Sequence, residues 1–404
     1  MENNGLRKGE VAVIGGGPAG LMAAEVIAAA GIGVTVFERM ASVGRKLLMA
    51  GRGGLNITHS EPDDRFLARY GAAAPWMRAQ LAAFSPQMLR QWCDDLGQPT
   101  FVGSSGRVFP QAMKASPLLR AWLRRLDGLG VRFVTRAGWT GWDDTGALTF
   151  DSGDRVFAEA TVLALGGASW PRLGADGGWT ALLPDIAVTP LRPANCGFAV
   201  GWSEPFRRRH AGTPLKSIAL SFGGRTVRGE AMITAEGIEG GAVYALAAAL
   251  RDAIAAGGPA RLLIDLRPDV AAARLAERLD RPRGSVSLST FLRKQGGLSP
   301  VAVGLLQEAL RAGTAAPLSA LVKALPVTLT APFGLARAIS TAGGIALDEL
   351  DRRLMLRRRP GLFAAGEMLD WEAPTGGYLL QGCLATGFCA GRGVVEWLSS
   401  PVQP

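Results

Sequence analysis

The chain of 404 residues has few of the side chains on which metal sites and hydrolytic sites depend. It contains four cysteines, none of them in a C-x-x-C pair, and only two histidines, His59 and His210. Disulfide frameworks, zinc knuckles and dithiol redox centres need paired cysteines, and a Ser-His-Asp site needs a well-placed histidine. We therefore expect reduced thiols, a cytoplasmic location, no metal site, and an organic cofactor that carries the difficult chemistry.

Long hydrophobic runs are also absent, so no membrane span is predicted. The apolar stretch near the amino end is interrupted by Gly15-Gly16-Gly17-Pro18 and by Glu25, a pattern that predicts a turn and a helix rather than a signal peptide. Hydrophobic residues make up 48% of the chain and charged residues only 19%, which excludes a disordered protein. The length predicts two or three hydrophobic cores.

Acidic residues are outnumbered, and the formal net charge is +10. The excess comes mainly from arginine clusters at 207–210, 281–283 and 352–359. Two interpretations remain open: a solvated basic surface, and RNA binding. The first is favoured because no patch of interleaved aromatic residues accompanies the arginines.

The most informative motif lies near the amino end. Residues 11–14 form a β-branched apolar run typical of a buried parallel strand, and Gly15-x-Gly17-x-x-Gly20 follows directly. Residues 21–30 predict a helix, and 34–37 predict a second strand that ends at Glu38. The motif alone is weak evidence, but in this context it predicts dinucleotide binding.

Each residue type in the motif has a physical role. Gly15 permits the tight turn, Gly17 lets a pyrophosphate approach the backbone, and Gly20 lets the helix pack closely on the strand. The helix that begins at Pro18 and Ala19 presents its N–H groups to the phosphates. Glu38 can accept hydrogen bonds from an unphosphorylated ribose.

A second glycine-rich segment, 44–58, is basic and is expected to be a loop that contacts the ligand rather than a solvated surface loop. Its cations could compensate a pyrophosphate or a reduced flavin, and its polar side chains could bond ring or ribityl oxygens. The candidate residues of this region, with Arg39 before it, are Arg39, Arg45, Lys46, Gly51, Arg52, Gly53, Asn56 and Thr58.

Two later apolar strands also end in glycine, at Gly166-Gly167 and at Gly366, where open α/β sheets bind ligands. Glu367 or Asp370 could then bond a ribityl hydroxyl. Gly376-Gly377-Tyr378 opens a predicted helix over 379–395, whose amino end could stabilise negative charge on a flavin. Together with the first motif, these segments favour FAD over NAD.

Six motifs resemble the bacterial BaiN/YhiN-like flavoproteins, a family that includes aminoacetone oxidase-like proteins, and the resemblance spans nearly the whole chain. The motifs are Val13–Gly20, Gly44–Leu48, Gly106–Pro110 with Lys114-Ala115, Leu165–Pro171, Thr341–Gly344, and Gly366–Asp370 with Pro374–Tyr378. The resemblance implies FAD contacts at Gly15, Gly17, Pro18, Ala19, Gly20, Glu38, Lys46, Gly166, Gly167, Gly366, Glu367, Gly376 and Gly377. It also implies an α/β fold in which a Rossmann-like FAD-binding domain of the GR2 type is split by an inserted β-barrel and helical domain.

The chain departs from that family at two positions. Many members have a cysteine where this chain has Leu55, and a mechanism of uridine reduction in ribosomal RNA that needs a thiol as proton donor cannot use this position, because leucine has no proton to give. Residues 234–241 replace a Thr-His-x-Gly-x-Ser-Gly-Pro pattern. The resemblance therefore indicates a divergent branch and does not identify the substrate.

We expect the FAD-binding domain over 1–190 and 336–404 and the substrate domain over 191–335. A second dinucleotide motif is absent, so NAD(P)H would bind transiently or the electrons would come from the substrate. The prediction is an FAD-dependent oxidoreductase that acts on a small molecule. The sequence identifies neither a catalytic base nor an oligomeric state. The alternatives are an amine oxidase-like enzyme, an RNA-modifying reductase, and a flavin-binding protein without catalysis.

Overall fold

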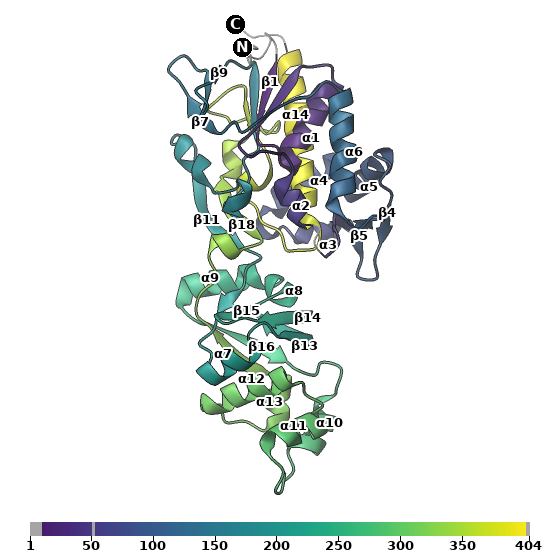
Figure 1. Ribbon diagram of the computed structural model, residues 1–404, viewed down its shortest axis with the longest axis vertical. Helices are drawn as coiled ribbons and strands as arrows, with labels where there is room; N and C mark the ends of the chain where they lie inside the picture. Colours follow the sequence, from purple (N-terminus) through teal and green to yellow (C-terminus); the bar gives the residue numbers. More distant parts are fainter. Residues whose placement is uncertain (1–9, 51–52, 401–404) are drawn as a thin grey trace. The chain divides into compact units, whose positions relative to one another are not determined.

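The computed structural model describes residues 10–50 and 53–400, and its chain divides into two units (Figure 1). Unit 1 comprises residues 1–192 and 340–404, and unit 2 comprises residues 193–339. The two segments of unit 1 come from opposite ends of the chain. They share one sheet, so the fold of unit 1 is interrupted in sequence but continuous in space.

A five-stranded sheet forms the centre of unit 1, and all four of its strand pairs are parallel. Its order is β19 (Leu362–Ala364), β10 (Ala160–Leu163), β1 (Val11–Ile14), β2 (Val34–Glu38) and β6 (Arg132–Thr135). All four residues of β1 are buried, as a central parallel strand with two covered faces requires. The predicted strands at 11–14, 34–37, 161–165 and 361–365 are confirmed to within two residues.

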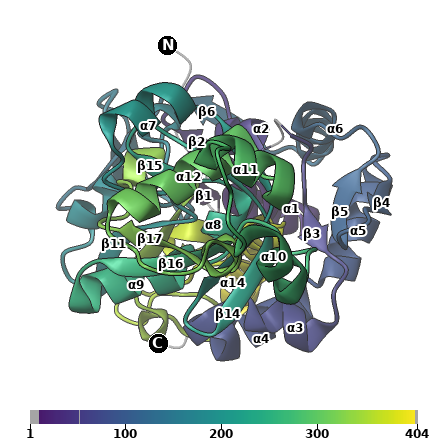
Figure 2. The ribbon, with the colours of Figure 1, turned by 90° about the horizontal axis from the view of Figure 1, so that it is seen from below.

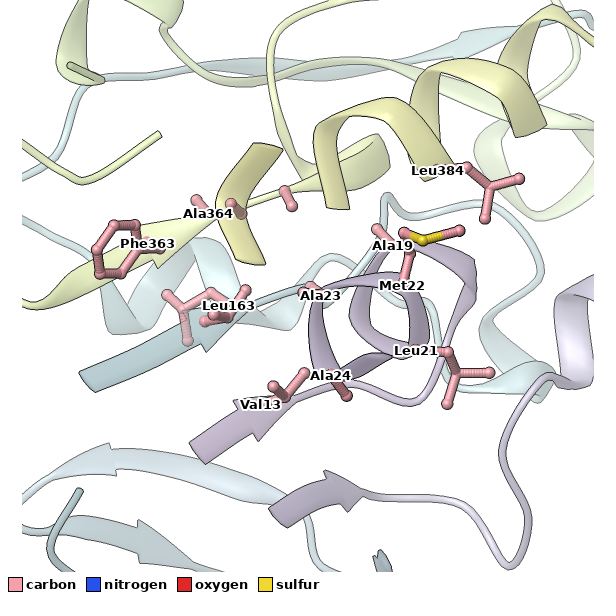
Figure 3. Close-up of a cluster of buried hydrophobic side chains, with 14 of the residues drawn as sticks. Val13, Ala19, Leu21, Met22, Ala23, Ala24, Leu163, Phe363, Ala364 and Leu384 are labelled. Carbon is pink, nitrogen blue, oxygen red and sulfur yellow. The ribbon is translucent and has the colours of Figure 1, made fainter. Parts of the chain in front are cut away.

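Helix α1 (Pro18–Ala29) packs against the sheet and against α14 (Tyr378–Ser399). Figure 3 shows side chains from α1, such as Ala19, Ala23 and Met22, meeting Leu163, Ala364 and Leu384. Small side chains bring the helices close: a Cβ placed at Gly391 would meet Val26 Cβ at 2.8 Å. This packing aligns the amino end of the first helix with the carboxyl end of β1, where the glycine motif lies.

The expectation of a loop over 44–58 was wrong for its first half, because residues 45–50 form helix α2 (Arg45–Ala50). The sequence Arg-Lys-Leu-Leu-Met-Ala consists of good helix formers, and Leu48 N donates to Gly44 O at 3.0 Å in the first turn. Leu47 is buried and anchors the helix. Helix propensity and one apolar anchor therefore outweigh the flanking glycines.

The other elements of unit 1 surround this core. Two small sheets have the orders β3-β5-β4 and β7-β8-β9, and β11 pairs with β18. The strands are β3 (Thr58–His59), β4 (Thr100–Val102), β5 (Arg107–Pro110), β7 (Trp139–Trp142), β8 (Leu148–Phe150), β9 (Arg155–Val156), β11 (Val188–Ala194) and β18 (Ser340–Ile345). The helices are α3 (Asp63–Ala68), η1 (Gly71–Ala73), α4 (Ala74–Ala83), α5 (Pro86–Asp95), α6 (Ala115–Gly128), η2 (Pro171–Leu173), η3 (Gly178–Leu182), η5 (Leu347–Glu349) and η6 (Gly366–Met368).

Unit 2 contains a six-stranded antiparallel sheet with the order β12-β15-β14-β13-β16-β17. Its strands are β12 (Phe198–Ala199), β13 (Pro214–Phe222), β14 (Arg225–Ile233), β15 (Gly237–Glu239), β16 (Ala260–Asp265) and β17 (Leu325–Leu329). Ala199 N donates to Ala331 O at 2.8 Å, and Thr330 N donates to Ala199 O at 3.0 Å. These bonds join the first strand to the residues after the last strand and close the sheet, which confirms the predicted barrel.

Helices complete unit 2, and α12 packs on β17. Figure 2 shows α11 beside α12, and α11 also packs on α10. The helices are α7 (Glu204–His210), α8 (Gly241–Tyr244), α9 (Ala247–Gly257), α10 (Ala272–Leu279), α11 (Leu288–Gly296), α12 (Pro300–Arg311), α13 (Leu318–Lys323) and η4 (Leu335–Arg337).

The arginine cluster at 207–210 was interpreted as a solvated surface, and for His210 this was wrong. Only 6% of His210 is exposed, and its ring centroid lies 5.0 Å from that of Phe206. Burial, together with the nearby Arg209 charge, lowers the pKa of the imidazole. The neighbouring arginines hid the fact that position 210 faces the interior.

Candidate functional site

The glycine turn after β1 is tightly packed at Gly15 and Gly20, but not at Gly17. Gly15 has φ +108°, and a Cβ there would collide with the backbone of Ala164. A Cβ at Gly20 would collide with Gly15 O, whereas a Cβ at Gly17 would have no atom of the described residues within 4 Å. Gly15 and Gly20 are therefore required by the fold, and Gly17 borders space that a ligand can enter.

The amino end of α1 faces that space without a side-chain cap. Gly17 is its N-cap residue, with no capping hydrogen bond from a side chain, and Pro18 occupies the first helical position. The first N–H groups of a helix have no partner within the helix, and its dipole favours an anion there. Pro18, Ala19 and Gly20 thus form a ready site for a pyrophosphate.

Glu38 lies at the end of β2, beside the turn. Its Oε2 accepts from Gly16 N at 2.9 Å, and its Oε1 accepts from Met40 N at 2.8 Å. These bonds fix the carboxylate, and each oxygen keeps a lone pair for a further donor such as a hydroxyl. The neighbouring Arg39 forms an ion pair with Asp176 at 2.6 Å in which both side chains are exposed.

A buried polar cluster joins four segments that are far apart in sequence. Lys46 Nζ lies 2.6 Å from Glu367 Oε2 and 3.0 Å from Ser169 Oγ. Glu367 Oε1 accepts from Thr341 N at 2.9 Å, and Thr341 Oγ1 accepts from Ala168 N at 2.8 Å. Only 6% of Glu367 is exposed, so Lys46 balances a charge that would otherwise be buried alone.

The glycines at the two later strand ends lie beside this cluster. Gly166 and Gly366 have φ values of +71° and +85°, and each accepts an indole N–H at its carbonyl, from Trp179 at 2.9 Å and from Trp371 at 3.0 Å. A Cβ at Gly167 would collide with Thr341. Asp370, by contrast, accepts from Thr189 Oγ1 at 2.6 Å.

A second polar region lies where β3 meets the start of α14. Gly377 is the N-cap residue of α14, with φ +92°, and a Cβ there would collide with Asn56 Oδ1 and lie 2.6 Å from Thr58 N. Among the described residues, Asn56 Oδ1, Asn56 Nδ2 and Thr58 Oγ1 are buried and have no hydrogen-bond partner. Buried polar atoms without partners are rare, because each costs about 1–3 kcal/mol of desolvation.

Gly376, with φ +128°, precedes this cap, and Tyr378 follows it. Tyr378 donates its hydroxyl to Glu61 Oε1 at 2.6 Å. Gly53 is exposed, whereas Gly51 and Arg52 lie outside the described residues.

The residues present fit an adenine dinucleotide that carries a flavin. The open position at Gly17 and the uncapped helix end suit the pyrophosphate, and Glu38 suits the ribose. The Asn56 amide and the Thr58 hydroxyl have no hydrogen-bond partner among the described residues and could bond the polar atoms of a flavin ring. In the part of the chain that the structure describes, no cluster of three or more His, Cys, Asp or Glu side chains could hold a metal ion.

Sequence reasoning missed the residues that support the predicted contacts. The structure adds Thr341 and Ser169 around Glu367, and Glu61 and Arg69 around Tyr378. Thr341 lies in one of the family motifs, so its sequence did carry a signal. Glu61 and Arg69 carried none, because single charged residues before and after a short helix are typical of a solvated surface.

The family model described as the HI0933-like protein Rossmann domain matches residues 9–393 of the chain. A 3-dehydro-bile acid delta(4,6)-reductase of Clostridium scindens is 27% identical over 410 residues, which cover 96% of this chain and 99% of that protein. A ribosomal RNA dihydrouridine synthase of Escherichia coli is 26% identical over 431 residues, covering 98% and 100%.

Two solved structures align with nearly the whole chain. A 3-ketosteroid delta1-dehydrogenase from Sterolibacterium denitrificans aligns with a TM-score of 0.52 and 13% identity, covering 98% of this chain and all of that one. Sdh1 of Mycobacterium smegmatis aligns with a TM-score of 0.50 and 18% identity, covering 98% and 70%. These likenesses concern the fold. Within the described residues, no helix is long and apolar enough to cross a membrane.

Proposed function

Because the chain belongs to the HI0933-like Rossmann family and is an FAD-dependent oxidoreductase, we propose that it reduces a carbon–carbon double bond conjugated to a carbonyl in a small organic substrate. The bile acid relative, named as a reductase of a 3-dehydro compound, supports this substrate class over nearly the whole chain. NAD(P)H is the proposed electron donor. Bound FAD would supply two-electron hydride chemistry between donor and substrate.

The chain's own residues would bind and orient that cofactor. We propose that the uncapped end of α1 holds the pyrophosphate, that Glu38 holds the ribose, and that Lys46 keeps the buried Glu367 charge-balanced beside the ring. The amino end of α14 at Gly376-Gly377 would stabilise negative charge on the reduced ring, because the helix dipole is positive there.

The observation that favours a small substrate over a uridine in RNA is Leu55. Leu55 is fully buried, and many members of the family that the chain resembles carry a cysteine there, so no thiol at this position of this chain can protonate a pyrimidine carbon. Nor do Cys93, Cys383 and Cys389 replace it, because burial raises the pKa of each thiol to about 12.

The test is anaerobic. FAD-loaded protein is mixed with NADH or NADPH, bleaching of the flavin absorbance is followed, and a cyclic α,β-unsaturated ketone or a uridine-rich RNA is then added. We expect bleaching by one nucleotide and recovery of the absorbance with the ketone alone. Failure of both nucleotides to bleach the flavin, or recovery only with RNA, would overturn the proposal.

Reduction of a base in RNA is the second candidate, and one observation favours it. Residues 193–339 contain 18 Lys and Arg against 10 Asp and Glu, whereas the rest of the chain contains 26 against 24. The excess positive charge of unit 2 suits a polyanion, and the Escherichia coli relative is named for its action on ribosomal RNA. Retention of RNA that weakens steeply between 50 and 200 mM salt would support this candidate.

We also propose a cytoplasmic location, which Cys93, Cys383 and Cys389 support because they form no disulfide within the described residues.

A further inference from the structure

The first residue of α14 is fastened to the segment that carries Asn56 and Thr58. Tyr378 donates its hydroxyl to Glu61 Oε1 at 2.6 Å, and its backbone oxygen accepts from Tyr70 Oη at 2.8 Å. The His59 ring lies nearly parallel to the Tyr378 ring, with centroids 5.5 Å apart. Three positions between residues 59 and 70 therefore contact one residue of α14.

Arg69 completes this arrangement through a two-point bond to Glu61. Its Nε lies 2.9 Å from Oε1, and its Nη2 lies 2.6 Å from Oε2, the planar geometry that suits a carboxylate. Burial alone would raise the pKa of Glu61, but the hydrogen bonds from Arg69 and Tyr378 outweigh it and lower that pKa. We call Glu61, Arg69 and Tyr378 the clamp.

His59 is held by the same segment and is not free to act on a ligand. Its Nδ1 accepts from Glu61 N at 3.0 Å, and its Nε2 lies 3.0 Å from Ser105 O. The His59 ring, which extends from β3, is held by these two contacts and packs against the Tyr378 ring.

The clamp lies beside the contact between Gly377 and the segment that carries the unpartnered side-chain atoms of Asn56 and Thr58. Thr58 follows Asn56 by two residues and precedes Glu61 by three, and the backbone of Thr58 touches the position where a Gly377 Cβ would be. Polar atoms bind a ring well only when their positions are set in advance, because ordering them on binding costs free energy. Fastening Glu61 to Tyr378 sets the distance between Asn56, Thr58 and the start of α14.

We propose that Tyr378, Glu61 and Arg69 are positioning residues that hold the Asn56 amide and the Thr58 hydroxyl in place for the ring of FAD, an inference that rests on the FAD site of the proposed function. The clamp then contributes more to cofactor affinity than to the stability of the apoprotein. Its effect passes through Asn56, so removing that amide removes most of the effect.

The experiment uses the full chain with Tyr378→Phe, Asn56→Leu and the double variant. Tyr244→Phe is the matched control, because Tyr244 lies in unit 2, outside the clamp. The Kd for FAD is measured by quenching of flavin fluorescence on titration of apoprotein, and the Tm is measured with and without FAD. We expect Tyr378→Phe to weaken FAD binding about tenfold and to shift the flavin absorbance maximum, with little change in the apoprotein Tm.

In the Asn56→Leu background, the same Tyr378→Phe change is expected to weaken binding less than threefold. A fall in the apoprotein Tm with an unchanged Kd would show a purely structural role and overturn the proposal, as would full additivity. If Tyr378→Phe does not fold, Glu61→Gln is tested in the same cycle. These readouts need no substrate or electron donor, so a failure of the proposed reaction would leave the clamp tested separately.

Discussion

The two ends of the candidate FAD site are built by different means. At the β1–α1 turn, the ligand surface is backbone, and the glycines around it are fixed by contacts with Ala164 and with each other. At the start of α14, the ligand surface is made of side chains, Asn56 and Thr58, which have no partners among the described residues. Backbone surfaces tolerate almost no added atoms, whereas side-chain surfaces allow graded changes. The substitutions below should separate these behaviours.

The largest effect is expected for Gly15→Ala. A Cβ there collides with the carbonyl of Ala164, and φ +108° is strained for alanine, so we expect a loss of about 3 kcal/mol, a fall in Tm of roughly 5–10 °C, and no retained FAD. Gly31→Ala is the control, because Gly31 also has a positive φ but nothing within 4 Å. If both variants lose the same Tm, the destabilisation comes from the positive φ and not from the collision of the new Cβ with Ala164.

Gly17→Val comes next and should separate binding from folding. No atom in residues 10–50 or 53–400 lies within 4 Å of a Cβ at Gly17, so we expect an unchanged apoprotein Tm. The valine would occupy the pyrophosphate position, and FAD binding should weaken about 100-fold, a change of about 2.7 kcal/mol. Fluorescence titration and thermal unfolding measure the two effects. A variant that binds FAD normally would place the pyrophosphate elsewhere.

Asn56→Leu is expected to change affinity and stability in opposite directions. Removing a buried amide without partners should raise the apoprotein stability by about 1 kcal/mol, while FAD binding weakens about tenfold. Thr35→Val is the control, because it removes another orphaned hydroxyl, on β2, and should stabilise the fold without changing the Kd. Weakened FAD binding in the Thr35 variant would show that added stability itself impairs binding.

The smallest effect concerns pH. The pKa of Glu61 is held below its usual 4.5, so its charge stabilises the fold fully above about pH 4.5, and this contribution is lost as pH falls through the folded-state pKa. The Tm difference between wild type and Glu61→Gln should be constant above pH 5 and shrink below it. Because Arg69 is 41% exposed, solvent screens the pair, and the effect should stay below about 1 kcal/mol.

Glu396→Gln serves as the control for the pH series. Glu396 forms an exposed pair with Arg392 on α14, outside the clamp. A constant Tm difference for this variant across pH 3–7, with a shrinking difference for Glu61→Gln, would assign the acid dependence to the clamp. Matching curves for the two variants would remove that assignment.

The fold was predictable wherever the pattern is local. The strand at 11–14, the glycine turn and the helix from Pro18 are neighbours in sequence, and their backbone geometry follows from residue type. The closed barrel of unit 2 came from the family resemblance rather than from periodicity. Helix α2 was missed because glycines on both sides of it suggested a loop.

The site was predicted as a set of residues but not as a set of contacts. Lys46 and Glu367 were both named from sequence, yet their ion pair joins positions 321 residues apart, which no spacing rule could anticipate. The ribityl role of Asp370 is still a prediction. In the structure, its carboxylate accepts a hydrogen bond from Thr189. Glu61 and Arg69 became visible only through their contacts with Tyr378.

The sequence by itself determined the dinucleotide turn, because φ values near +108° and the absence of a Cβ are properties of glycine that act over a few residues. Only the tertiary structure decided which polar side chains meet at α14. Whether Asn56 has a partner, or Glu61 faces Tyr378, depends on how segments more than 300 residues apart pack together, and that information is spread over the whole core.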